Sequence, residues 1–220
     1  MILGHASDLH GRYAMLESVA LPDVWVITGD FFPNKGRGQT GRIEADAEIA
    51  HQVRWWRNKG PSVMRRLGGR PVLWVGGNHD FVNLAGLLKV SKYDGATFDV
   101  ADAPVDFGGH RFAGFREVPY MEGEWVGESH DLSDVVARAM DADPTVLLTH
   151  APPAGILDDD GMGTLGHGGG VSPLTTALTW RPHRIVAHLF GHIHEHSGRD
   201  VEEMGIRFYN GAEKVRLVEI

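Results

Sequence analysis

The stretch "PVLWVGGNHD", from Pro71 to Asp80, places an apolar run directly before two glycines and a group of polar side chains. A short run of aliphatic and aromatic residues bounded by Pro and Gly is typical of a buried strand. Asn78, His79 and Asp80 follow at its carboxyl end. Because ligands bind outside the carboxyl ends of strands in open α/β sheets, the stretch predicts a strand that ends in a functional site.

Four other apolar runs end in the same way. They cover 2–6, 24–28, 145–149 and 185–190, and the candidate ligands after them are Asp8 with His10, Asp30, His150, and His192 with His194. Each of these side chains offers a carboxylate oxygen or an imidazole nitrogen. Since the strands of such a sheet end at a common edge, we expect these residues to meet in one crevice although they are far apart in the sequence.

The apolar runs alternate with helical patterns, which favours an α/β fold with one or two mixed sheets. The spacing predicts a helix over 43–56, Pro61 is expected to begin a second short helix, and Ser133 and Ser172 are expected to cap two more. The remaining strands, expected in antiparallel hairpins, are 97–100, 105–107, 111–115, 206–209 and 215–218. No repeat or linker-like segment interrupts the chain, so we expect one domain over 1–220.

The composition limits the partners of the protein. The net charge is −8, which disfavours binding to long duplex nucleic acid because that binding needs cationic side chains. There is no Cys, which excludes disulfides and thiolate zinc sites. The sequence begins without a basic and apolar leader and contains no run of about eighteen apolar residues, so we expect a cytoplasmic protein without a membrane partner. The oligomeric state is left open.

The candidate ligands have the chemistry of a metal centre. Asp8 and His10, like His192 and His194, lie two residues apart, so each pair can bind as a unit. Carboxylate, imidazole and amide together suit Mn first, with Fe, Zn, Ni, Co or Mg as alternatives. Seven ligands, with Asn78 included, exceed the needs of one ion, which indicates two divalent ions about 3.5–4 Å apart. Asp30 is the candidate bridge, because it follows a glycine that permits a tight turn.

Five blocks in this order resemble the calcineurin-like metallophosphoesterases: "SDLHG", "GD", "GNHD", "TH" and "GHIH", which together span Asp8 to His194. The resemblance implies a four-layer αββα sandwich in which two mixed β-sheets are flanked by helices. It also implies the role of each residue. The first ion would be held by Asp8, His10 and His194, the second by Asn78, His150 and His192, with Asp30 between them; His79 would reach the scissile phosphate or the leaving group, and Asp80 would orient His79.

The last third of the chain is similar to MPPED-type phosphodiesterases, on the segments "LLTHAPPAGILDD" and "HLFGHIHEHSG". This similarity implies hydrolysis of small phosphodiesters such as 2′,3′-cyclic nucleotides by direct attack of a metal-bridging hydroxide. The chain departs from other branches after Asp30, where Phe31 to Pro33 supply no further carboxylate. The pattern of the Ser/Thr phosphatases is absent, which argues against a phosphoprotein substrate.

Several alternatives stay open from the sequence. The activity of a nuclease or a phosphomonoesterase of the same fold, or a non-catalytic interaction module, is compatible with the pattern. Segments 31–41 and 161–170, the second of which carries His167, are candidates for substrate contact, with a flexible solvent loop as the alternative for the second. Tyr120 and Trp125 are candidates for stacking on a base or for packing within a lid.

Overall fold

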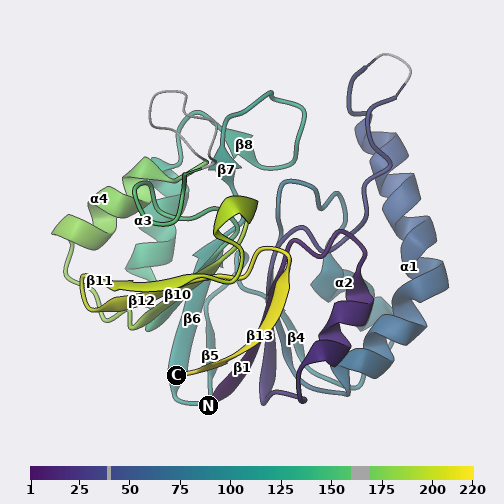
Figure 1. The fold of residues 1–220 in the computed structure, drawn as a ribbon, viewed down its shortest axis with the longest axis horizontal. Helices are drawn as coiled ribbons and strands as arrows, with labels where there is room; N and C mark the ends of the chain where they lie inside the picture. The colour runs from purple at the N-terminus through teal and green to yellow at the C-terminus, as the bar shows by residue number, and fades with distance from the viewer. Residues whose placement is uncertain (39–40, 160–168) are drawn as a thin grey trace.

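The computed structural model describes residues 1–38, 41–159 and 169–220. The first of its two large sheets has five strands in the order β13-β1-β2-β3-β4 (Figure 1). These strands are β1 (Ile2–Ser7), β2 (Val24–Thr28), β3 (Val72–Val75), β4 (Thr97–Asp99) and β13 (Lys214–Glu219). Strands β1 to β4 run parallel, and β13 pairs antiparallel with β1.

The second sheet has six strands in the order β11-β12-β10-β9-β6-β5. Its strands are β5 (Val105–Phe107), β6 (His110–Phe115), β9 (Val146–Thr149), β10 (Ala187–Phe190), β11 (Asp200–Glu203) and β12 (Ile206–Asn210). The four central strands are parallel, and the edge strands β5 and β11 are antiparallel to their neighbours. Short strands β7 (Val118–Pro119) and β8 (Glu128–Ser129) pair with each other.

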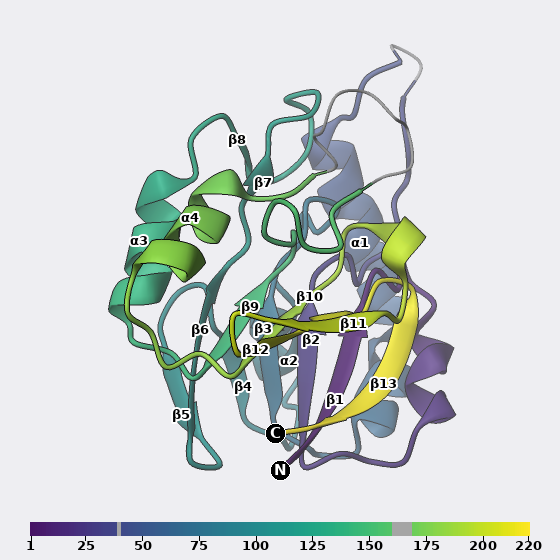
Figure 2. The ribbon, with the colours of Figure 1, turned by 60° about the vertical axis from the view of Figure 1, so that its left-hand side comes forward.

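Helices cover the outer faces of both sheets, with α1 and α2 on one side of the molecule and α3 and α4 on the other (Figures 1 and 2). They are α1 (Ala45–Leu67), α2 (Leu84–Val90), α3 (Ser133–Asp141) and α4 (Ser172–Trp180), and 3-10 turns η1 (Tyr13–Ser18) and η2 (His194–His196) complete the elements. This arrangement confirms the predicted sandwich of two mixed sheets between helices. No described helix has the length and apolar character needed to cross a membrane.

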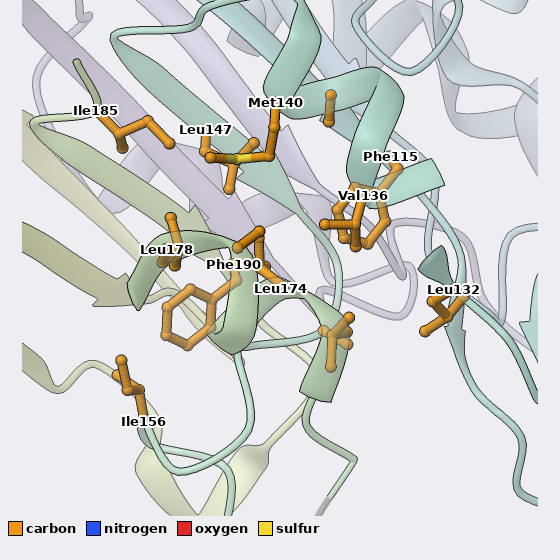
Figure 3. Packing of buried hydrophobic residues seen from close by; sticks show 14 of the residues in the cluster. Phe115, Leu132, Val136, Met140, Leu147, Ile156, Leu174, Leu178, Ile185 and Phe190 are labelled. Atoms are coloured by element: carbon orange, nitrogen blue, oxygen red, sulfur yellow. The ribbon is translucent and has the colours of Figure 1, made fainter. Parts of the chain in front are cut away.

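The alternation of side chains along each strand produces three separate cores. In β2, Val24 and Val26 pack into the core between the two sheets, whereas Trp25 and Ile27 pack toward α1 and α2. On the far side, Leu147 and Phe190 of the second sheet pack with residues of α3 and α4, including Met140 and Leu178 (Figure 3). The strands therefore carry apolar side chains on both faces, as expected for parallel strands between helix layers.

Two expectations about local structure were wrong. Helix α1 continues through Pro61, because Trp56, Val63 and Leu67 on one face stay buried against the first sheet and offset the lost backbone hydrogen bond. Strand β4 is an edge strand that pairs in parallel with β3, so the hairpin expected there is absent among the described residues. Strand β12 does form an antiparallel hairpin with β11, and it also pairs in parallel with β10 on its other side.

The caps of α3 and α4 also differ from the expectation. Ser133 and Ser172 are the first helical residues, and neither helix has a side-chain hydrogen bond from its N-cap. In α3 the carboxylate of Asp131 instead accepts the backbone N–H of Ser133 at 2.9 Å. The N-cap positions are therefore Leu132 and Val171, one residue before the predicted serines.

Candidate metal centre

The segments that follow β1, β2, β3, β9 and β10 meet at one end of the two sheets, at the opposite end from the chain termini (Figure 1). Their backbones approach very closely at glycines. A Cβ atom on Gly29 would lie 2.4 Å from Nδ1 of His150, and one on Gly77 would lie 2.2 Å from Oδ1 of Asp30. Glycine is therefore required at these two positions for the five segments to converge.

The structure brings the seven predicted ligands together. Three groups have ligand atoms within 4.8 Å of one another, and these are Asp8 with His10 and His194, His10 with Asp30 and His79, and Asp8 with Asp30 and His150. Asn78 Oδ1 lies 3.0 Å from Nε2 of His150, and the ring of His192 lies 5.0 Å from the ring of His150. Asp30 contacts His10 at 3.9 Å and His150 at 3.3 Å, so it lies between the two predicted ligand sets.

Four of the ligands have left-handed backbone conformations. The φ angles are 54° at Asp8, 44° at His10, 52° at Asp30 and 68° at His192. Backbone hydrogen bonds hold the first three, because the N–H of Asp8 donates to Gly29 and the N–H of His10 donates to Asp30. Uncommon backbone conformations of this kind gather at functional sites, since surrounding contacts must offset their cost.

The electrostatics of the site fit a bound cation. Asp8 and Asp30 are buried, and no Lys or Arg among the described residues pairs with either carboxylate. Burial opposes their ionisation, yet contacts with His194 and His150 hold the pKa values of Asp8 and Asp30 below the usual range. Burial also opposes a charge on His150, but attraction to Asp30 raises its pKa to about 10.

A divalent cation is the natural replacement for the proton on His150. Oxygen and imidazole donors suit divalent ions, and metal binding to histidine releases a proton. Burial lowers the pKa of His192 to about 4, which keeps that ring neutral as a ligand must be. Nδ1 of His150 lies 2.8 Å from the carbonyl oxygen of Thr28, a contact that orients Nε2 toward Asp30. The residues therefore fit a metal centre.

His79 borders the centre without belonging to the predicted ligands. Its Nε2 lies 3.9 Å from Oδ2 of Asp30, and its Nδ1 contacts the side-chain amide of Asn34. The indole of Trp125 packs on the imidazole with ring centroids 4.0 Å apart. Sequence reasoning did not assign Asn34 or Trp125 to this ring. The available signal was the position of Asn34, four residues after Asp30 and within the segment 31–41 that was predicted to contact substrate.

Asp80 contacts the backbone rather than His79. Its carboxylate accepts N–H groups from Phe31 at 3.0 Å, Phe32 at 3.1 Å and Gly77 at 2.9 Å. Burial raises the pKa of Asp80 to about 7. The side chain thus joins the segment after β2 to the segment after β3, and it influences His79 only through the backbone.

The segment after β2 is held by carboxylates from two other parts of the chain. Glu48 accepts the backbone N–H groups of Lys35 and Gly36, each at 2.8 Å, and Arg37 pairs with Glu122 and Glu124. The contacts of Glu48 join the segment to α1, and the pairs of Arg37 join it to residues 122–124. Residues 39–40 and His167 lie outside the described residues, so the predicted role of His167 stays a prediction.

Two mixed sheets between helices, with carboxylates and imidazoles gathered at the strand ends, define an α/β protein with a metal-binding centre. A family model described as calcineurin-like phosphoesterase matches residues 1–196, and the chain belongs to this family. Membership indicates a metal-dependent phosphoester hydrolase, and the family typically binds a dinuclear metal centre. The broader resemblance is thereby confirmed, whereas the MPPED-type similarity stays a prediction.

Two solved structures are similar to this chain at low sequence identity. The phosphopantetheinyl hydrolase PptH from Mycobacterium tuberculosis is 17% identical with a TM-score of 0.53, over 96% of this chain and 89% of that one. The sulfate thiohydrolase SoxB from Thermus thermophilus is 15% identical with a TM-score of 0.43, over 96% of this chain and 51% of that one. A comparison with curated proteins gives no match. At 17% identity the likeness to PptH concerns the fold alone.

Proposed function

We propose that the protein is a dinuclear-metal-dependent phosphodiesterase that hydrolyses small substrates such as 2′,3′-cyclic nucleotides. The observation that carries the proposal is the convergence of the seven predicted ligands, with the buried carboxylate of Asp30 between the two sets. Asp8, His10 and His194 would hold one ion and Asn78, His150 and His192 the other, with Asp30 shared. Manganese is the first candidate metal.

The residues around the metals have separate tasks. Two divalent ions held by these residues would supply an activated water and positive charge for the phosphoryl oxygens. His79 presents Nε2 toward Asp30 while Asn34 and Trp125 hold the other edge and a face of the ring. In this proposal Nε2 gives a proton to the leaving oxygen, and its position facing Asp30 supports that role. Since an alkoxide is a poor leaving group, this proton contributes on the order of 10²- to 10⁴-fold in rate.

The charge of the site supports a diester over a monoester substrate. A monoester dianion carries more charge than a diester, and sites for phosphate groups commonly use Arg forks. The charged partners of Asp8, Asp30 and His79 among the described residues are histidines and carboxylates. A singly charged diester therefore matches this centre better.

A panel of substrates tests the proposal. With Mn²⁺ present, we expect faster hydrolysis of bis-p-nitrophenyl phosphate than of p-nitrophenyl phosphate, and turnover of 2′,3′-cAMP. 3′,5′-cAMP and single-stranded DNA complete the panel. Faster hydrolysis of the monoester would favour a phosphomonoesterase, and preferential cleavage of DNA would favour a nuclease.

The variant His79→Ala tests the proton donor. Metal content should stay unchanged, because His79 is outside the predicted ligand set. Turnover should fall about 10²- to 10⁴-fold for 2′,3′-cAMP and much less for bis-p-nitrophenyl phosphate, whose nitrophenolate leaves without a proton. His51→Ala, on helix α1, is the matched control. An equal loss for both substrates would contradict the role as proton donor, and loss of metal would make His79 a ligand.

A further inference from the structure

A cleft opens directly beside the candidate metal centre. It encloses about 740 Å³, within the range of small-molecule sites, which is about 300–1,000 Å³. The residues that line it include the predicted ligand His192 and come mainly from three segments: Pro119 to Met121, Ser129 and His130 with Leu132, and Gly169 to Pro173. A Cβ atom on Gly169 would lie 2.5 Å from Nε2 of His192, so the backbone of Gly169 in the cleft contacts the imidazole of this predicted metal ligand.

The walls of the cleft are apolar and carry a flat aromatic surface. Met121, Leu132 and Ile193 contribute apolar side chains. The rings of Tyr120 and His130 stack on each other with centroids 3.9 Å apart and planes 25° apart. Tyr120 is 46% exposed, so its ring is accessible for a further contact.

The aromatic surface is held in place before any ligand binds. The N–H of Tyr120 donates to the carbonyl of Ser129 at 3.0 Å. The carboxylate of Glu128 accepts the N–H groups of Met121 at 3.2 Å and of Glu122 at 3.0 Å. A fixed ring loses little conformational entropy when it stacks on a ligand.

The charges of the cleft restrict the group that it can bind. Among the described residues that line it, Glu195 is the charged side chain, and none is Lys or Arg. A second phosphate or another anion would meet a carboxylate without a cationic partner. An uncharged planar group has apolar walls and an aromatic face to contact.

We propose that this cleft binds the uncharged planar ring of the substrate, a nucleobase in the first instance, while the phosphodiester lies at the metal centre. Tyr120 is the specificity-determining residue, with His130 behind it and Met121 beside it. The inference rests on the proposed function for the position of the phosphate, but the binding of the ring requires neither metal nor turnover.

Binding of adenosine tests the cleft separately from catalysis. Adenosine carries no phosphate, and ligand-observed NMR with the full chain detects its binding even at millimolar Kd. Tyr120→Ala and Tyr120→Leu should weaken binding about tenfold, at the lower end of base–aromatic stacking, and Tyr120→Phe should restore it. Trp180→Ala removes an exposed aromatic side chain outside the cleft and should have no effect. Absence of adenosine binding, or equal binding by all variants, would overturn the proposal.

A matched pair of substrates then tests specificity. 2′,3′-cAMP and glycerol 1,2-cyclic phosphate share a five-membered cyclic diester, and only the first carries a base. The kcat/KM should be about tenfold higher for 2′,3′-cAMP, and Tyr120→Ala should remove this preference. Equal kcat/KM values in the unaltered protein would overturn the cleft inference and leave the phosphodiesterase intact. If no phosphodiester is hydrolysed while adenosine binds through Tyr120, the proposed function fails and the cleft inference stands.

Discussion

Acidification from pH 7.5 to pH 5 should destabilise the protein through His188, a fully buried residue of β10. Nε2 of His188 lies 2.8 Å from Oγ1 of Thr149, and that hydroxyl donates to the carbonyl of Ala151 at 2.6 Å. The hydroxyl oxygen can therefore only accept from Nε2–H, and Nδ1 has no hydrogen-bond partner. A proton added to Nδ1 would be buried and unpaired, and burial lowers the pKa of His188 to about 3.

The direction and size of this pH effect follow from proton binding to His188 in the folded and unfolded states. Between pH 3 and pH 6.5 the unfolded chain binds a proton at this histidine and the folded chain does not. The unfolding free energy is therefore highest, as far as His188 determines it, above pH 6.5, and it decreases progressively as the pH falls toward 3. At pH 5 the loss amounts to about 2 kcal/mol, since each pH unit below the unfolded pKa costs about 1.4 kcal/mol.

Urea unfolding of the unaltered protein and of His188→Gln measures this effect. Glutamine keeps an N–H for Thr149 but does not titrate. The fall in unfolding free energy between pH 7.5 and pH 5 should be about 2 kcal/mol smaller in the variant. At equal Mn²⁺ concentration the metal-ligand histidines titrate in both proteins and cancel. His51→Gln is the control and should behave like the unaltered protein. Equal losses in His188→Gln and the unaltered protein would refute the reasoning.

Three further outcomes are expected. Elemental analysis should show that Gly191→Ala has lost bound metal, because a Cβ atom at this position would lie 2.0 Å from Oγ of Ser7 and 2.1 Å from Oδ2 of Asp8. Gly86→Ala, on α2, is the control and should retain the metal. Asp80→Asn should lower the unfolding free energy in urea by about 1–3 kcal/mol, because an amide has one acceptor oxygen for the three N–H groups that the carboxylate serves. Chelation with EDTA should lower Tm and added Mn²⁺ should restore it, because the ions bind the folded chain only.

The buried strands of the fold were predictable from sequence, but their pairing was not. Val72–Val75 was placed correctly because an apolar run bounded by Pro and Gly has few other solutions. Thr97–Asp99 was assigned to a hairpin because helix Leu84–Val90 was not recognised. A helix between two strands supplies the crossover that parallel pairing requires. Its N-cap, Asn83, which accepts the N–H of Gly86 at 2.8 Å, was the missed signal.

The convergence of the ligands was predictable for a similar reason, because the position of each one at a strand end is a local feature. The partners of those residues are not local. Asn34 reaches His79 across 45 positions, and Trp125 reaches it from the connection between β6 and α3. Asp80 was assigned to its neighbour in sequence, yet its carboxylate turns to the backbone of Phe31 and Phe32. Loop geometry decides these contacts, and apolar patterns carry no information about it.

The metal centre also joins the two sheets, and this has a consequence for stability. Nδ1 of His150, at the end of β9, contacts the carbonyl of Thr28 in β2, and the N–H of His192 donates to Asp8 at 3.0 Å. Both contacts cross from one sheet to the other beside two buried carboxylates. Without a cation, Asp8 and Asp30 are stabilised by contacts with His194 and His150. Each predicted ion would be held by residues from both sheets, one by Asp8, His10 and His194 and the other by Asn78, His150 and His192. Metal should therefore stabilise the protein against global unfolding, and not only against the opening of a single loop.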